Sequence, residues 1–385
     1  MSSRNKKVSI YVSDDIVLSI LSKLPLKSVN RFTCVHKCWS LLFENSCFVN
    51  MFYKNMVSKY QSLGDEEKCL LTNYFDSTNW QWKLHVLSLE TFESKMQLNF
   101  PHPFKPDLYR SPSPSTLVSY ADGVLCIYDR YHSDIALWNH VTAELNIIPR
   151  SIAIRKEGSG MHEEFRFYKE FHINTIIHGF GYDQIKDDYK IIQYVKGRGC
   201  WEDRLPYPLW EIYSLKRKFW KRLYLDDMPT RSGMCDPLSF NGVCHWCGYI
   251  RDETYVVSFY FNTETHVTTP LPKNMQDLDC SEIYLILLNG YVAMISSYVL
   301  EDRVSIAILT ELGVMESWIK LFDFIPSSNM YYPIGASKNG DLLYKHKDQL
   351  ISVDLTTGIV LNIDLNKDIK DVLGEKESRS NMLVY

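Results

Sequence analysis

Apolar positions at helical spacing open the chain. One stripe has apolar side chains at i, i+1, i+4, i+5 and i+8, namely Ile16, Val17, Ile20, Leu21 and Leu24. Ser13 is a favourable N-cap in front of this stripe, and the two acidic residues after it suit the positive end of a helix dipole. Pro25 excludes the preceding residue from helical backbone. The pattern therefore predicts a helix that starts after Ser13 and ends before Pro25.

Two more short helices are predicted before residue 50. One spans residues 27–32, with Val29 and Phe32 on one side. The other has apolar side chains at i, i+4, i+7 and i+8, namely Val35, Trp39, Leu42 and Phe43. About fifty residues cannot bury this many large side chains by themselves. We therefore expect part of this helical surface to pack on a partner.

The period of the pattern changes after residue 59. Residues 58–68 are polar and indicate a linker, and short apolar runs separated by turn signals follow. Four of these runs start after a small polar residue and a glycine, at Gly123, Gly242, Gly290 and Gly340. The last three glycines are about 50 residues apart, a period typical of a propeller blade of four antiparallel strands.

The repeat predicts an all-β propeller over residues 68–365. At about 40–50 residues per blade, this length gives about six or seven blades. Trp220 and Trp318 are expected to pack between neighbouring sheets. Residues 366–385 have little apolar pattern, and we expect a polar, solvated tail.

Charge and hydropathy exclude several classes of function. A formal net charge of −4 gives no overall field for nucleic acid. Residues 283–300 lack charge, but Asn289-Gly290 at their centre predicts a hairpin of two buried strands instead of a membrane span. The first residues lack the apolar run of a signal peptide. We therefore expect a cytoplasmic or nuclear protein that binds neither nucleic acid nor membrane.

No motif in the sequence predicts a metal, a cofactor or a catalytic group. Cys34, His36 and Cys38 alternate, which on a helix spreads them around the axis, and a structural zinc site needs four ligands. Cys244 and Cys247 have C-x-x-C spacing but belong to a predicted strand, whereas reactive dithiols sit at a helix start. His162 lies in a charged insertion without a second histidine at metal-binding spacing.

The first module resembles an F-box over residues 9–52. The resemblance is carried by features in the family's order and spacing, namely Asp14-Asp15-Ile16, Ile20-Leu21, Leu24-Pro25, Lys27-Ser28, Phe32, Cys34-Val35, Lys37, Trp39, Leu42 and Phe48. The chain departs from the family at Val12-Ser13, where members usually have Leu-Pro. The resemblance implies docking on a Skp-type adaptor, which joins a cullin and a RING subunit.

The second module resembles the plant F-box-associated, kelch-like interaction domain, as found in S-locus F-box proteins. The matching sequence motifs are "GFGYD" at residues 179–183 and "DDYKII" at residues 187–192. The predicted organisation is thus a three-helix F-box (residues 9–55), a linker (56–67), the β-propeller (68–365) and the tail (366–385).

Together the two resemblances imply a non-catalytic substrate receptor of an SCF-type cullin-RING ubiquitin ligase, with an unknown target protein. The adaptor-binding residues are predicted to be Ile16, Ile20, Leu21, Leu24, Pro25, Val29, Val35 and Trp39. Replacing Leu24 by Asp and Trp39 by Ala is predicted to abolish adaptor binding. The insertions at residues 151–171 and 196–208 are candidate target-binding loops. Two alternatives remain open, an adaptor-independent interaction protein with a decayed F-box and a propeller enzyme.

Overall fold

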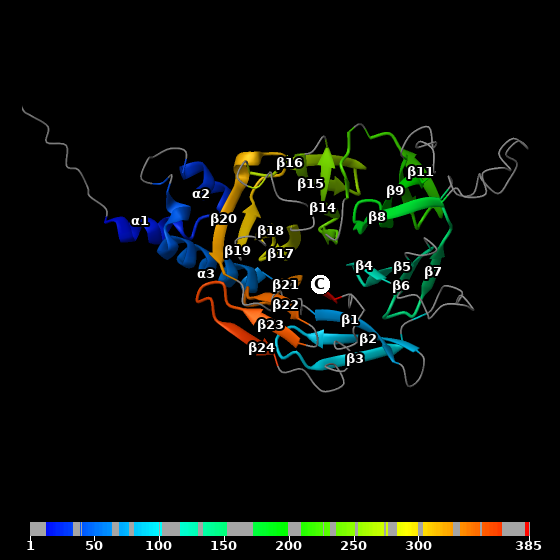
Figure 1. Ribbon diagram of the computed structural model, residues 1–385, viewed down its shortest axis with the longest axis horizontal. Coiled ribbons are helices and arrows are strands. Elements are labelled where there is room, and N and C mark those ends of the chain that lie inside the picture. The colour runs from blue at the N-terminus through cyan, green and yellow to red at the C-terminus, as the bar shows by residue number, and fades with distance from the viewer. Residues whose placement is uncertain are drawn as a thin grey trace, which may run out of the picture.

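Six β-sheets follow one another around a ring, and helices lie against two of them (Figure 1). The structure is a computed structural model. It describes residues 13–33, 39, 41–63, 69–76, 81–99, 101, 116–129, 134–151, 172–198, 209–225, 227–231, 236–250, 253–272, 275, 283–298, 303–325, 332–346, 349–363 and 382–384. The predicted helices followed by a propeller are confirmed, and the number of blades is six.

The helices form one module, which we call the helical module. Its elements are α1 (Asp14–Leu21), α2 (Leu26–Thr33), the 3-10 turn η1 (Leu42–Glu44) and α3 (Ser46–Leu63). The backbone of Ser13 is extended, and its carbonyl accepts the N–H of Val17 at 3.1 Å, so α1 begins where the cap residue predicts. The first two helices agree with the sequence pattern.

The third helix lies further along the chain than the sequence pattern predicts. Residues 39 and 41 are in turns, and only η1 overlaps the expected segment, whose residues 34–38 lie outside the described residues. The helix α3 instead starts at Ser46 and runs through residues 56–63, which the sequence analysis assigns to a linker. The reason is that Phe52, Tyr53 and Met56 continue one apolar stripe into that segment and are buried.

Each sheet forms one blade, and the blades are numbered in chain order. Blade 1 contains β25 (Met382–Val384), β1 (Cys69–Asp76), β2 (Gln81–Ser88) and β3 (Ser94–Asn99). Blade 2 contains β4 (Thr116–Ala121), β5 (Val124–Asp129), β6 (Asp134–Asn139) and β7 (Leu145–Ile148). Blade 3 contains β8 (His172–Asp183), β9 (Asp188–Arg198), β10 (Leu209–Ser214) and β11 (Phe219–Leu223).

The second half of the ring has the same arrangement. Blade 4 contains β12 (Thr230–Arg231), β13 (Leu238–Phe240), β14 (Val243–Ile250), β15 (Glu253–Tyr260) and β16 (Thr265–Pro270). Blade 5 contains β17 (Ile283–Leu288), β18 (Tyr291–Tyr298), β19 (Arg303–Leu309) and β20 (Trp318–Phe324), with the 3-10 turn η6 (Met315–Ser317) before β20. Blade 6 contains β21 (Tyr332–Ala336), β22 (Leu342–His346), β23 (Gln349–Val353) and β24 (Val360–Ile363). The strands pair antiparallel in every blade.

Tight turns with left-handed backbone set the register of the hairpins. Asn289 and Gly290 have φ of 49° and 82°, so the predicted hairpin between β17 and β18 is confirmed. Asn241-Gly242 joins β13 to β14 in the same way. In these turns, the small polar residue and the glycine supply the two positive φ values that a two-residue turn of this type requires.

The C-terminal end of the chain closes the ring. Residues 382–384 pair antiparallel with β1, with Leu70 opposite Val384 and Thr72 opposite Met382. In Figure 1 the C-terminus lies near the centre of the ring. These three residues therefore belong to blade 1, and the expectation of a solvated tail is wrong for them. Closure leaves β1 with a partner on each side and gives blade 1 four strands, as in blades 2, 3, 5 and 6.

Hydrophobic clusters occupy the spaces between neighbouring blades. Each of the six pairs of neighbours shares one cluster, which makes the ring continuous. Trp220 lies between blades 2 and 3, and Trp318 packs on the cluster between blades 4 and 5. Their indole N–H groups donate to the carbonyls of Pro149 at 2.6 Å and Pro270 at 3.0 Å, each at the end of the preceding blade. The predicted packing role of both tryptophans is confirmed.

Candidate functional site

Two isoleucines of α1 face outward. Ile16 and Ile20 are one helical turn apart and lie on the same side of the helix, where 53% and 55% of their surface is exposed. We call these two residues the α1 patch. Asp14 and Asp15 precede the patch in the first turn, where the helix dipole favours negative charge. The patch is thus an apolar surface next to an acidic one.

Two further apolar side chains of the helical module are exposed, Phe32 of α2 and Leu41 before η1. The ring of Phe32 stands edge-on to that of Trp39, with centroids 5.7 Å apart and planes at 89°. Phe32 belongs to the F-box motif but not to the eight predicted site residues, and Leu41 belongs to neither set. Leu41 and Leu42 look alike in the sequence, and only the fold shows that Leu42 enters the core.

The structure separates the eight predicted adaptor-binding residues into groups. Ile16, Ile20 and Pro25 are exposed, and Leu24 and Trp39 are half-buried against the core. Leu21 and Val29 are buried inside the chain, so they hold the helical module together. Val35 lies outside the described residues. Of the eight, the side chains available to a partner in this conformation are therefore those of the α1 patch and Pro25, with the outer parts of Leu24 and Trp39.

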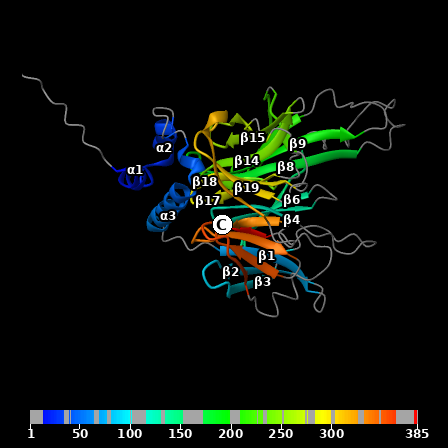
Figure 2. The same cartoon turned by 60° about the vertical axis from the view of Figure 1, so that its left-hand side comes forward.

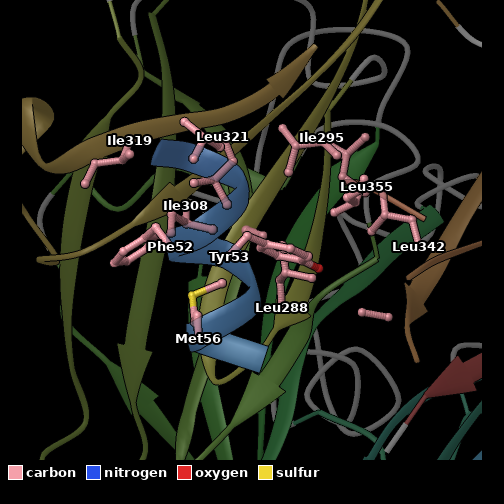
Figure 3. Close-up of a cluster of buried hydrophobic side chains, with 14 of the residues drawn as sticks. Phe52, Tyr53, Met56, Leu288, Ile295, Ile308, Ile319, Leu321, Leu342 and Leu355 are labelled. Carbon is pink, nitrogen blue, oxygen red and sulfur yellow. The ribbon is translucent and has the colours of Figure 1, made fainter. Parts of the chain in front are cut away.

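The core of the helical module is also the core between blades 5 and 6. Figure 3 shows Phe52, Tyr53 and Met56 of α3 among side chains of the propeller. The propeller residues of this cluster that Figure 3 labels are Leu288, Ile295, Ile308, Ile319, Leu321, Leu342 and Leu355. An ion pair joins Lys27 of α2 to Glu311 of blade 5 at 3.2 Å. The helices are consequently an extension of one inter-blade core.

The C-x-x-C pair lies in a strand, as predicted. Cys244 and Cys247 belong to β14 and are completely buried in two different inter-blade clusters. An odd separation places them on opposite faces of the sheet. Burial raises the pKa of the Cys244 thiol to about 12, and this thiol donates to the carbonyl of His178 at 3.3 Å. The pair therefore has the environment of structural thiols.

The "GFGYD" motif of β8 connects blades 3 and 4. A Cβ atom at Gly179 would lie 2.2 Å from Sγ of Cys244, and one at Gly181 would lie 2.4 Å from the ring of Phe261. Glycine is thus required at both positions for the blades to approach each other. Asp183, which ends the motif, is buried, and its carboxylate accepts a hydrogen bond of 3.0 Å from the ammonium of Lys190. The motif serves the packing of the ring.

The described part of the chain has neither a metal-ligand cluster nor a membrane-spanning helix. Among those residues, no three His, Cys, Asp or Glu side chains come together as metal ligands would. Within the same residues, no helix combines the length and apolar character that a membrane crossing requires. His162, which the sequence analysis considers, lies outside the described residues.

Comparison with known proteins assigns the family. The family model of the F-box associated beta propeller domain matches residues 69–384. The chain belongs to this family. Its plant relatives include the Arabidopsis thaliana sequence named "Putative F-box protein At3g16210", 20% identical over 98% of this chain and 90% of that relative. Another, named "Putative F-box protein At5g52610", is 23% identical over 83% of this chain and 84% of its own length.

The family match fits the architecture of this F-box protein. The matched segment begins at the first residue of β1 and ends with the last residue of β25, so it covers the complete ring. The propeller domain thus extends beyond the predicted boundary at residue 365. Proteins of this family are substrate receptors of SCF-type ligases and are generally non-catalytic.

Proposed function

We propose that this protein is the substrate-recognition subunit of an SCF-type cullin-RING ubiquitin ligase, as the sequence analysis predicts. The α1 patch docks on a Skp-type adaptor, and through it on the cullin and RING subunits. The propeller holds the target protein. The receptor makes and breaks no bonds, and it acts by raising the effective concentration of target lysines near the conjugating enzyme.

The exposure of the α1 patch is the observation that carries this proposal. Its neighbour Leu21 is buried, while about half of the surface of Ile16 and of Ile20 is exposed to solvent, although burial of an isoleucine contributes about 1.5–3 kcal/mol. Apolar anchors one turn apart on a helix are suited to a groove on a partner protein. Because about half of each side chain is already covered, we estimate about 1 kcal/mol from each on docking.

The target is proposed to bind on the face of the ring away from the helices. The helical module packs on the side where β17 and β21 end, at the tight turns of Asn289-Gly290 and Gly340. Antiparallel pairing means that β7 and β9 end on the opposite side. The long connections 149–171 and 199–208 start there, and they include most of the two insertions predicted to bind the target. These connections lie almost entirely outside the described residues.

The test uses the full-length chain and a purified Skp-type adaptor. Leu24 and Trp39 pack on the core, so the double change suggested by the sequence would also disturb the fold. We therefore choose Ile16→Asp with Ile20→Asp, and expect adaptor affinity to fall at least about 30-fold, because two apolar contacts are lost and two carboxylates are placed in the interface.

The matched control is Val141→Asp with Ile185→Asp. These two side chains are 77% and 78% exposed on turns of blades 2 and 3, far from the helices in the ring. The control should bind the adaptor like the unmodified chain, and both double variants should keep its melting temperature. Undiminished adaptor binding by the α1 variant would show that the patch is not the docking surface.

A further inference from the structure

Three features connect the α1 patch to the propeller through α3. The first is that the helical module lacks a separate core. Phe52, Tyr53 and Met56 of α3 are buried in the cluster that also contains both blades 5 and 6. Figures 1 and 2 show α3 beside the strands of this part of the ring. Without these blades, the buried face of α3 would be exposed to water.

The second feature is a close contact between α3 and one turn of blade 6. The buried hydroxyl of Tyr53 donates to the carbonyl of Gly340, in the turn between β21 and β22. Gly340 has a φ of +86°, and a Cβ atom there would lie 2.5 Å from the hydroxyl of Tyr53 and 2.8 Å from Val57. Any side chain at this position would therefore push α3 away from the blade.

The third feature is a pair of hydrogen bonds that joins α3 to the end of α1. The side-chain amide of Asn55, in the middle of α3, donates to Oγ of Ser22 at 2.9 Å and to its carbonyl at 3.3 Å. Ser22 directly follows the last residue of α1. Leu21, at the end of α1, is buried in the same cluster as Tyr53. The position of the α1 patch thus depends on α3, and the position of α3 depends on blade 6.

We infer that the propeller is a structural part of the adaptor-binding site. The α1 patch takes its binding form only on folded blades 5 and 6, and Tyr53 and Gly340 are the positioning residues. This inference rests on the proposed function. It implies that a chain with an unfolded or open propeller does not enter the ligase, so that assembly selects folded receptors.

The decisive experiment compares two glycine variants of the full-length chain. Gly340→Ala introduces a side chain against α3. Gly123→Ala is the matched control, because Gly123 has nearly the same φ of +84° but no atom within 4 Å of the added Cβ. Both variants carry the same backbone strain, and only the first displaces α3. The measurements are adaptor affinity and amide hydrogen exchange of α1 and α3.

We expect Gly340→Ala to weaken adaptor binding by about fivefold or more, the lower end of usual coupling between sites. Exchange of α1 and α3 amides should accelerate in this variant and stay unchanged in Gly123→Ala. Equal affinity and equal exchange in the two variants would overturn the inference. Failure of the unmodified chain to bind the adaptor would instead overturn the proposed function.

A second pair of variants keeps the test decisive if Gly340→Ala fails to fold. Tyr53→Phe removes only the hydroxyl that bonds to Gly340. Tyr128→Phe is its control, since the buried hydroxyl of Tyr128 donates to the carbonyl of Thr175 at 2.6 Å, between blades 2 and 3. Both lose one buried hydrogen bond. Tyr53→Phe should weaken adaptor binding more than Tyr128→Phe, and equal effects would contradict the inference.

Discussion

A buried lysine between blades 3 and 4 allows a quantitative test of the fold. The side chain of Lys190 in β9 is only 3% exposed. Its ammonium donates to Asp183 at 3.0 Å, to Glu264 at 3.0 Å and to the carbonyl of Phe261 at 2.8 Å. Asp183 belongs to blade 3, and Glu264 and Phe261 to the turn between β15 and β16 of blade 4. Two of the three bonds, those to Glu264 and Phe261, therefore join blade 3 to blade 4.

Lys190→Met should destabilise the chain strongly. The change keeps the length of the apolar stem but leaves the carboxylate of Asp183 buried without its main partner. Removing one member of a buried ion pair costs about 3–5 kcal/mol. Backbone N–H groups of Ile185 and Lys186 still donate to Asp183 at 3.1 Å, so we expect the lower end, about 3 kcal/mol. In a chain of this size that corresponds to a melting temperature about 5 °C lower.

The matched control is Lys221→Met in β11. This lysine also bonds to Glu264, at 2.6 Å, but its side chain is 54% exposed, and an exposed ion pair contributes only about 0–1 kcal/mol. The assay is urea or thermal unfolding of both variants beside the unmodified chain at pH 7. Equal losses of stability in the two variants would refute the argument that the large contribution of Lys190 to stability comes from burial and not from ion pairing as such.

The effect of Lys190→Met should depend on pH. Burial alone would raise the pKa of Asp183 and of Glu264, but hydrogen bonds from lysines keep both pKa values below their ordinary range. A carboxylate with a lowered pKa contributes stability above its unfolded pKa, near 4, and loses it as the pH falls through the folded pKa. The difference between the unmodified chain and the variant should therefore be largest near pH 7 and narrow below about pH 4.

Two further predictions concern thiols and ring closure. Cys47 is exposed and should react with iodoacetamide at pH 8, whereas Cys244, which is buried and has a pKa raised to about 12, should stay unmodified in the native chain. Peptide mass spectrometry measures the labelling of each thiol, and equal labelling would contradict the prediction. Deletion of residues 382–385 removes the strand that pairs with β1 and should lower the melting temperature by several degrees, measured by circular dichroism. An unchanged melting temperature would show that closure by β25 adds no stability.

Local signals in the sequence predict several of the individual hairpins and the first two helices. The reason is that Ser13, Pro25 and Asn289-Gly290 act on their immediate neighbours in the chain. The third helix could have been predicted from the sequence in the same way. Phe52, Tyr53 and Met56 continue an apolar stripe, but the polar composition around residue 60 favours a linker when it is read alone. The helix extends because blades 5 and 6 cover that stripe.

The number of blades could not be obtained from glycines alone. Each blade has a left-handed residue in the turn between its last two strands, at Phe92, Ala143, Lys218, Glu264, Gly313 and Gly358. Only two of these are glycine, so the structural repeat is stricter than the sequence repeat. Closure by residues 382–384 is a contact with the other end of the domain, and three residues are too few to form a pattern.

The sequence predicts the site only as a set of candidate residues, and it does not show which of them are exposed. Ile16, Ile20 and Leu21 are all apolar members of one wide stripe on α1, and residue type does not indicate which edge of the stripe enters the chain's own core. The answer depends on α3 and blade 5, which are far away in the sequence. For the same reason Leu21 and Val29, which are predicted to bind the adaptor together with the α1 patch, are internal.

The placement of the helices bears on how a receptor of this form acts by proximity. The helical module packs on one side of the ring, and β7 and β9, the strands before the two candidate target-binding connections, end on the other side. An adaptor on the α1 patch and a target at those strand ends would not compete for surface. Because α3 shares its core with blades 5 and 6, the connection between the two surfaces is stiff along its described part. A stiff connection presents a bound target in a narrow range of orientations, whereas a flexible linker averages over many. We therefore expect the choice of target lysine to follow from the pose of the target on the propeller.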